Sequence, residues 1–359
     1  MLDFERRKTK TVRVGAVELG GKCDIAVQSM TNTDTHDKEA TLKQVRELEA
    51  AGCDIVRITA PTLQSCDTFA YLKAEGVRVP LVADIHFNYE IALAAVKAGA
   101  DKIRINPGNI GDRKKIRAVV HACACRGVPI RIGVNSGSLE KHILEKYSHP
   151  CAEALAESAL YHAGLLEELG FYDIVLSVKA SNVPEMIKAN RILAERTSYP
   201  LHLGVTEAGG GESAVVKSAV GIGALLSEGI GDTVRVSLTD NPVAEVAAAR
   251  EILKALNLSK NPGMDIIACP TCGRTRISLI DMLSEFKARV KREGLDSLNI
   301  KVALMGCAVN GPGEAREADL GIAGGDGCGL LFSHGQILRK VPEERLLDEL
   351  ISEIKKYRK

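Results

Sequence analysis

The chain has 359 residues, of which 45% are hydrophobic and 26% charged, which is ordinary for a globular protein large enough for two domains. A net charge of +1 and an aromatic content of 4% without tryptophan argue against a nucleic-acid partner, because neither a global basic field nor a base-stacking platform is available. The first ten residues lack the apolar segment of a signal peptide, and no apolar run is long enough to span a membrane. We therefore expect a cytoplasmic protein without a membrane partner.

From about residue 25 to residue 257 the sequence repeats one unit, in which a short β-branched run precedes a polar turn and an amphipathic helical pattern. The strand-like runs are 25–30, 54–59, 81–86, 102–106, 130–135, 174–179, 201–206 and 233–238, and helical periodicity is clearest at 38–51, 61–75 and 243–256. Eight such units predict an α/β fold, a (β/α)₈ barrel of the TIM type, with a hairpin at 11–21 closing its bottom. A doubly wound sheet is the alternative, but the sequence lacks the Gly-rich phosphate turn that usually opens it.

The polar segment N-L-S-K-N-P-G at 257–263 breaks this pattern and predicts a domain boundary. We expect the barrel to occupy residues 1–260 and a smaller α+β domain to occupy residues 261–359. In the second domain the pattern predicts helices at 277–293 and 342–356 and strands at 301–305, 320–323 and 336–341.

Cationic side chains occur near the C-terminal ends of five predicted barrel strands, where barrels of this type carry their chemistry. Burying such a cation without a partner costs several kcal/mol, so we expect these side chains to line the open mouth and to bind an anion, with a diphosphate as the favoured ligand. The alternative is that they pair with Asp and Glu inside the barrel. The five cations are Arg57, Arg104, Arg131, Lys179 and Arg235.

Other polar residues fall at the same strand ends. His86 lies beside Asp84, which favours a contact with the substrate over a purely structural histidine. Glu207, in G-V-T-E-A-G-G-G-E, is our candidate proton donor, although an acid at a helix N-terminus would also fit this position. Asn106, Asn135 and Ser237 complete the set of polar strand-end residues.

Three cysteines in the last quarter of the chain indicate a metal centre. Cys269 and Cys272 lie in C-P-T-C-G, and Cys307 lies in G-C-A-V-N-G-P-G-E, where Glu314 follows seven residues later. Three thiolates with a different fourth ligand suit an iron–sulfur cluster that is open to chemistry better than a closed structural zinc site. Zinc and a redox-active C-x-x-C pair are the alternatives, and Cys328 is a less favoured fourth ligand. The remaining cysteines are expected to be small buried side chains.

The motifs Q-S-M-T-N-T, A-D-I-H-F, R-I-N-P-G-N, R-I-G-V-N, C-P-T-C-G-R and G-C-A-V-N-G-P-G-E-A occur in this order. With these motifs the chain resembles, over nearly its whole length, the bacterial 4-hydroxy-3-methylbut-2-enyl diphosphate synthases of the methylerythritol phosphate pathway to isoprenoids, in their two-domain form. The resemblance implies a [4Fe–4S] cluster held by Cys269, Cys272, Cys307 and Glu314. It also implies reductive ring opening and dehydroxylation of 2-C-methyl-D-erythritol 2,4-cyclodiphosphate with two electrons.

The resemblance further implies roles for the strand-end residues. A diphosphate clamp of Arg57, Arg104, Arg131 and Lys179 would be completed by Asp84, His86, Asn106, Asn135, Arg235 and Ser237, with Glu207 as the acid near the substrate. Ferredoxin or flavodoxin would donate electrons, and a head-to-tail homodimer would share each active site between subunits. Two alternatives are a zinc-stabilised phosphate-binding lyase or hydrolase and a non-catalytic iron–sulfur redox sensor.

Overall fold

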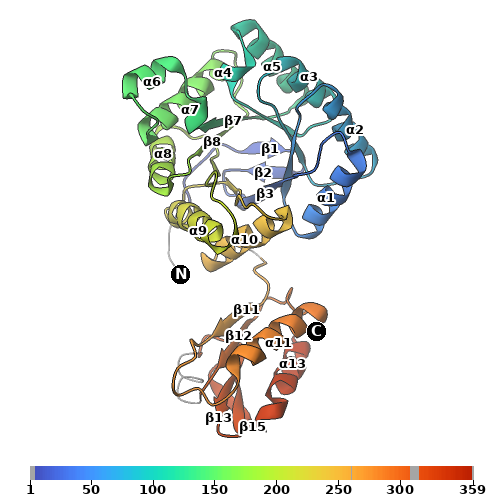
Figure 1. The fold of residues 1–359 in the computed structure, drawn as a ribbon, viewed down its shortest axis with the longest axis vertical. Coiled ribbons are helices and arrows are strands. Elements are labelled where there is room, and N and C mark those ends of the chain that lie inside the picture. The colour runs from blue at the N-terminus through green and yellow to red at the C-terminus, as the bar shows by residue number, and fades with distance from the viewer. Residues whose placement is uncertain (1–4, 260, 308–314, 358–359) are drawn as a thin grey trace. The chain divides into compact units, whose positions relative to one another are not determined.

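The computed structural model describes residues 5–259, 261–307 and 315–357. The chain divides into two compact units, Met1–Ser259 and Lys260–Lys359 (Figure 1). Within the described residues, no helix combines the length and the apolar character needed to cross a membrane.

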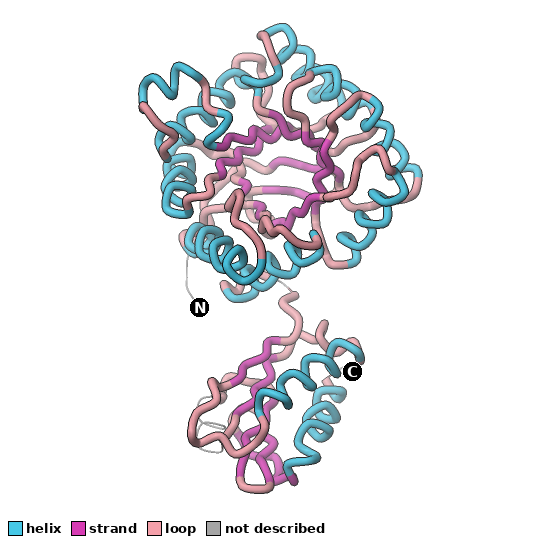
Figure 2. Tube along the Cα trace, viewed as in Figure 1, coloured by secondary structure: helices cyan, strands magenta, loops and turns pink. Residues whose placement is uncertain are grey.

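The larger unit is a parallel β-barrel surrounded by helices (Figure 2). Consecutive strands pair in chain order, the last strand pairs with the first, and an isolated parallel bridge between Leu176 and Leu201 joins the two ends of the sheet. The predicted TIM-type barrel is therefore confirmed over the doubly wound alternative. Its strands are β3 (Ala26–Met30), β4 (Ile55–Thr59), β5 (Leu81–Asp84), β6 (Lys102–Ile105), β7 (Ile130–Asn135), β8 (Ile174–Lys179), β9 (His202–Leu203) and β10 (Thr233–Val234).

The seventh and eighth barrel strands are much shorter than the predicted runs 201–206 and 233–238, so these two predictions of length were wrong. Gly204 follows β9 directly, and a Cβ there would lie 2.6 Å from the carbonyl oxygen of Arg235. Glycine has no side chain to pack along a strand and permits this close approach of two backbones. Apolar residues continue to alternate past the glycine, which is why the sequence predicts a longer strand, but the regular hydrogen bonds between strands end there.

Helices cover the outside of the barrel. The long ones are α1 (Lys38–Ala50), α2 (Asp67–Ala74), α3 (Tyr89–Lys97), α5 (Arg113–Arg126), α7 (Ala152–Glu167), α8 (Val183–Arg196), α9 (Gly211–Ser227) and α10 (Pro242–Ala255), with short helices α4 (Pro107–Ile110) and α6 (Lys141–Tyr147). The helix predicted at 61–75 starts later, with a 3₁₀ turn at Gln64–Cys66 before α2. Thr62 and Ser65 explain the delay, because each side-chain oxygen accepts the other residue's backbone N–H and forms a turn.

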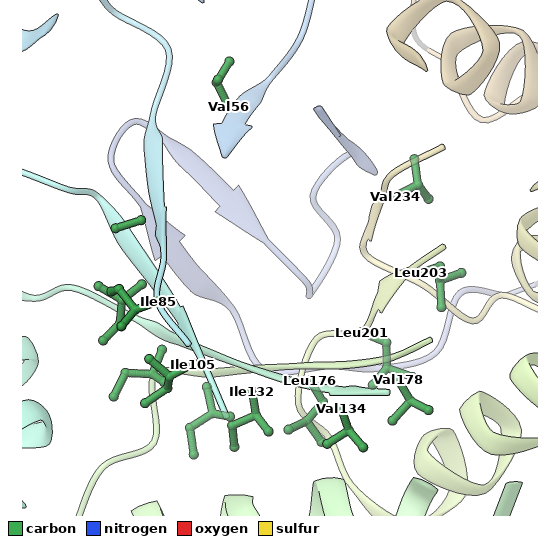
Figure 3. Packing of buried hydrophobic residues seen from close by; sticks show 14 of the residues in the cluster. Val56, Ile85, Ile105, Ile132, Val134, Leu176, Val178, Leu201, Leu203 and Val234 are labelled. Atoms are coloured by element: carbon green, nitrogen blue, oxygen red, sulfur yellow. The ribbon is translucent and has the colours of Figure 1, made fainter. Parts of the chain in front are cut away.

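Two apolar layers stabilise the barrel. Strand residues that point outward, such as Val56, Ile132 and Leu176, pack in the large core between the strands and the helices (Figure 3). The inward residues at the bottom pack instead against a two-stranded antiparallel hairpin, β1 (Val12–Val14) and β2 (Val17–Leu19). The predicted hairpin at 11–21 is thus confirmed, and it fills the N-terminal end of the barrel so that only the opposite end is open to polar chemistry.

The smaller unit is an α+β domain with a five-stranded sheet in the order β11 (Asp265–Ala268), β12 (Lys301–Met305), β13 (Leu320–Gly325), β14 (Cys328–Ser333) and β15 (Gln336–Pro342). The first three strands are parallel and the last three antiparallel. Helices α11 (Leu279–Arg292) and α13 (Leu346–Lys356) contribute buried residues to its core. The sequence did not predict β11 or β14, and a 3₁₀ turn at Glu343–Arg345 replaces the start of the predicted last helix.

Candidate active site

The C-terminal ends of the barrel strands surround a cavity of about 180 Å³. Strand alternation explains which side chains line it: Val56 and Ile58 pack outward into the core, so Arg57 between them points inward. The lining residues are Arg57, Asp84, His86, Arg104, Arg131, Gly133, Val134, Asn135, Ser177, Lys179, Thr206, Arg235 and Ser237.

Two glycines make room for long cations inside the barrel. A Cβ at Gly133 would lie 2.4 Å from Nε of Arg104, and a Cβ at Gly204 would lie 2.8 Å from Nζ of Lys179. Neither distance is compatible with a real side-chain atom, so any larger residue would displace the cation beside it. The absence of a side chain at these positions therefore helps to set the direction of both cations.

Asp84 connects two of the arginines. Its carboxylate lies 3.3 Å from Nη1 of Arg104 and 3.8 Å from Nε of Arg57, and its side chain is only 4% exposed. Burial alone would raise the pKa of Asp84, but Arg57 and Arg104 together lower it to about 2. Burial also lowers the pKa of Arg57, to about 10, which leaves this guanidinium charged at neutral pH. His86 joins the group through Nε2, which lies 3.2 Å from Nη1 of Arg104.

Arg235 has its own buried acid. Glu245, on α10, forms two contacts with this guanidinium, at 2.9 Å and 3.1 Å, and its side chain is 3% exposed. The sequence did not single out Glu245. Pairing with an acid, the alternative raised above, is thus observed for Arg57 and Arg104 through Asp84 and for Arg235 through Glu245, which comes from helix α10.

Arg131 and Lys179 have no acidic partner among the described residues. Arg131 is 1% exposed, and its Nε and Nη1 atoms have no hydrogen-bond partner in that part of the chain. Burial, followed by the neighbouring cations, lowers the pKa of both Arg131 and Lys179. Lys179 is only half-buried and lines the open cavity, where solvent and an anion can stabilise its charge. The cavity therefore has cations in excess of acids, which favours an anionic ligand. The cations at the cavity are Arg57, Arg104, Arg131, Lys179 and Arg235, and the acids are Asp84 and Glu245.

In the smaller unit, two of the predicted cysteine ligands lie on neighbouring strand ends. Cys269 follows β11, and Cys307 follows β12 by two residues. The backbone N–H of Gly306 donates to Sγ of Cys269 at 3.2 Å, so the backbone next to Cys307 touches this sulfur. The pKa of Cys272 is lowered, mainly by a hydrogen bond from the backbone N–H of Arg274, which favours the thiolate form that binds metals.

Glu314 lies outside the described residues. Within the described residues, no three His, Cys, Asp or Glu side chains are close enough together to hold a single metal ion. Cys328, the less favoured ligand, opens β14, and its thiol donates to the carbonyl oxygen of Asp326 at 3.4 Å.

Comparison with known proteins gives the same two-part division. The family model described as the GcpE TIM-barrel domain matches residues 9–250, and the one described as the GcpE protein C-terminal domain matches residues 265–356. The chain belongs to the GcpE family.

Curated relatives of this GcpE-family chain are similar over almost their full length. It is 56% identical over 356 residues to the 4-hydroxy-3-methylbut-2-en-1-yl diphosphate synthase (flavodoxin) of Geobacillus thermodenitrificans strain NG80-2, covering 98% of this chain and 93% of the relative. It is 55% identical over 348 residues to the enzyme of the same name from Clostridium perfringens strain 13 / Type A, covering 97% and 98%. The predicted family resemblance is confirmed.

A solved structure with a similar fold is the wild-type HPPK-DHPS of Plasmodium falciparum with STZ-DHP. The TM-score is 0.51 at 12% identity, over 71% of this chain and 51% of that chain. At this identity the similarity concerns the barrel fold alone.

The cavity contains nine of the ten substrate-binding residues predicted from the sequence of this GcpE-family chain. The tenth, Asn106, is not among the lining residues, because its side chain is used to cap α4 and accepts the backbone N–H of Gly108 at 3.0 Å. Glu207 is exposed, follows the lining residue Thr206, and has a positive φ of 53°. The nine predicted residues found at the cavity are Arg57, Asp84, His86, Arg104, Arg131, Asn135, Lys179, Arg235 and Ser237.

Sequence reasoning missed four lining residues, Gly133, Val134, Ser177 and Thr206. Strand alternation could have identified Ser177, because it precedes Lys179 by two positions on β8 and so points to the same side. Gly133 likewise lies two residues after Arg131 on β7.

Proposed function

We propose that this GcpE-family enzyme converts 2-C-methyl-D-erythritol 2,4-cyclodiphosphate into 4-hydroxy-3-methylbut-2-enyl diphosphate. The reaction takes up two electrons and two protons, opens the ring and releases one water. The observation that carries this proposal is the charge of the barrel cavity, in which Arg131 and Lys179 are cations without an acidic partner among the described residues. The names of relatives that are more than half identical to the chain support the same reaction.

The cavity residues would bind and orient the diphosphate. Arg131 and Lys179, which lack acidic partners in the described part of the chain, would contact its oxygens most strongly, because an unpaired cation gives up no ion pair to make the contact. Arg57 and Arg104 keep their direction through Asp84, so they would bring charge to the anion in a preorganised geometry. Arg235 and the polar side chains His86, Asn135 and Ser237 would complete the contacts.

Glu207 is the proposed acid near the substrate. It follows the cavity residue Thr206, and its exposed side chain is accessible from solvent in the barrel unit. Glu207→Gln keeps the size of the side chain but removes the proton. We expect this variant to bind pyrophosphate as the wild type does and to lose turnover, and unchanged turnover would exclude Glu207 as the proton donor.

We propose that Cys269, Cys272, Cys307 and Glu314 hold a [4Fe–4S] cluster. The donor set of thiols and one carboxylate fits such a cluster, and the contact between Gly306 and Sγ of Cys269 brings two of the thiol-bearing segments together. A cluster is bound at separate corners, so its thiols need not converge on one point as they would around zinc. When bound, the cluster supplies single electrons. Glu314→Ala should lose turnover and keep its fold, and wild-type rates would remove Glu314 from the site.

Ferredoxin or flavodoxin is the proposed electron donor of this cytoplasmic enzyme, since the curated relatives are named for flavodoxin.

We also propose a head-to-tail homodimer in which the cluster domain of one subunit serves the barrel of the other. Cys269→Ser and Arg131→Met should each abolish or strongly reduce turnover alone. Mixing the two variants should restore activity, because one site of the mixed dimer then has an intact barrel and an intact cluster. No restoration after proven subunit exchange would contradict the shared site.

The first experiment measures iron, sulfide and zinc in protein purified without oxygen, together with its visible spectrum. About four irons and four sulfides per chain, with broad absorption expected from thiolate-bound iron, would support the cluster, and turnover with an artificial reductant would then separate the enzyme from a redox sensor. One zinc and no colour after attempted reconstitution would favour a zinc-stabilised lyase or hydrolase.

A further inference from the structure

A buried lysine inside the barrel has no role in the function proposed above. Lys102 is fully buried on β6, two residues before Arg104, so both side chains point into the barrel interior. Its Nζ has no hydrogen-bond partner among the described residues. A buried ammonium without a partner is costly, and such groups tend to lose their proton instead.

The other polar groups of the barrel interior cannot compensate a charge on Lys102. Gln28 on β3 and His202 on β9 are both buried, and each retains side-chain atoms without a partner in the described part of the chain. His202 Nδ1 lies 3.3 Å from Oγ1 of Thr233. Water among these groups could accept or donate hydrogen bonds, but it carries no countercharge.

The charged side chains around Lys102 are mostly cations. Asp84 in the interior and Glu245 on α10 are both engaged by arginines. The pKa of Lys102 is lowered well below its usual value, first by burial and then by Arg131 and Arg57. The titratable groups around this interior and the cavity above it are Arg57 on β4, Asp84 on β5, His86 after β5, Arg104 on β6, Arg131 on β7, Lys179 on β8, His202 on β9 and Arg235 after β10, with Glu245 on α10 paired to Arg235.

We propose that Lys102 is an uncharged amine in the free protein and takes up one proton from solvent when an anion with several charges fills the cavity above it. The proton binds Nζ and no other bond changes. The anion reverses the local potential, and nearby charges of opposite sign raise the proton affinity of an amine. The barrel thereby gains a further positive charge only when the cavity is occupied. This inference rests on the proposed diphosphate site and adds a residue that selects for highly charged ligands.

Binding of inorganic pyrophosphate tests the inference. Dissociation constants for the full-length wild type, Lys102→Met and the exposed control Lys97→Met are measured by calorimetry from about pH 6 to pH 10. Methionine keeps the length of the side chain and represents the uncharged amine. Titration of pyrophosphate is common to all three proteins, so it cancels in the ratio of their dissociation constants.

We expect the wild type and Lys102→Met to bind equally at high pH. As the pH falls, the advantage of the wild type should grow by up to tenfold per pH unit and level off at about 10- to 1000-fold, the equivalent of a pKa increase of about 1–3 units on binding. Lys97→Met should match the wild type throughout. A ratio that stays constant over the whole range would overturn the inference, because Lys102 would then have the same charge in both states.

Lysine Cε resonances in ¹³C-labelled protein provide a direct measurement. The signal that disappears in Lys102→Met should titrate well below the ordinary lysine range in free protein, and its midpoint should rise when pyrophosphate saturates the wild type. An ordinary midpoint in free protein, or a midpoint that pyrophosphate does not move, would overturn the inference while leaving the proposed function intact. If calorimetry finds no binding of pyrophosphate to the wild type, the diphosphate site and this inference both fail.

Discussion

Arg235 and Glu245 form a buried two-point ion pair, with Nη2–Oε1 and Nε–Oε2 distances of 2.9 Å and 3.1 Å. The same carboxylate accepts a hydrogen bond from the hydroxyl of Ser29 at 2.7 Å and from the backbone N–H of Leu238 at 3.2 Å. Glu245 therefore fixes the direction of a cavity arginine and connects α10 to β3 and to the segment after β10.

Replacing Glu245 should reveal how much this buried pair contributes to stability. Glu245→Ala leaves the Arg235 guanidinium, which is 16% exposed at the cavity, without its acid, and removing one partner of a buried pair costs up to about 3–5 kcal/mol. The matched control is Glu228→Ala, because Glu228 binds Arg191 with the same two-point geometry at 2.9 Å and 2.5 Å but is 38% exposed. That surface pair should contribute less than about 1 kcal/mol. Urea unfolding measures both, and equal losses would contradict the difference in burial.

Much of the cavity could be predicted because strand alternation is a local rule. Once Val and Ile occupy the outward positions of a strand, an arginine between them must point inward, and the barrel fold brings these inward residues to one mouth. This reasoning needs only the sequence of one strand at a time, so it identified Arg57, Arg104 and Arg131 correctly.

The features that the sequence did not reveal depend on contacts between elements. Glu245 lies on a helix and looks like any helical acid until the fold brings it against Arg235. Asn106 ends a strand but also starts a helix, and its side chain caps that helix. Lys102 precedes Arg104 on the same face, yet its lack of a partner is visible only when the whole interior is assembled.

Asp84 should make stability depend on acid pH. Its folded-state pKa of about 2 lies below the ordinary value of 3.8, so its contribution is present above about pH 4 and is lost as the pH falls toward 2. The difference corresponds to about 2 kcal/mol. We expect the stability advantage of the wild type over Asp84→Asn, measured by urea unfolding, to shrink over this interval.

Asp232→Asn is a control for which the stability should depend on pH in the opposite direction. Burial raises the pKa of Asp232, so the folded state retains its proton more strongly than the unfolded state does. The stability of the wild type relative to Asp232→Asn should therefore increase as the pH falls through the raised folded-state pKa of Asp232 toward 3.8, and it should level off below that value. If both variants show the same pH dependence, the arginines around Asp84 do not determine its protonation.

Gly133→Ala should weaken anion binding while leaving the fold of the barrel intact. The new Cβ would meet Nε of Arg104 at 2.4 Å, and because this atom belongs to a flexible side chain, the arginine should move while the strand remains intact. Loss of one charge-assisted contact corresponds to about 1.5–3 kcal/mol, or roughly 10- to 150-fold weaker pyrophosphate binding. Gly164→Ala, on α7 with no atom near its added Cβ, should leave binding unchanged. Normal affinity in Gly133→Ala would show that Arg104 does not contact the anion.

Arg131→Met should weaken anion binding without destabilising the free protein. The substitution removes a buried guanidinium whose Nε and Nη1 have no partner among the described residues, so the free energy of unfolding should stay the same or rise. Pyrophosphate affinity should fall by about 1.5–3 kcal/mol, because a charge-assisted hydrogen bond is lost. Urea unfolding with and without pyrophosphate measures both quantities, since a ligand that binds only the folded state stabilises it more the tighter it binds.

Arg113→Met, which removes an exposed ion pair with Glu168, should preserve the stabilisation by pyrophosphate. A destabilised Arg131→Met protein that still gains full stabilisation from pyrophosphate would make Arg131 a structural residue of the barrel and leave anion binding to the other cations.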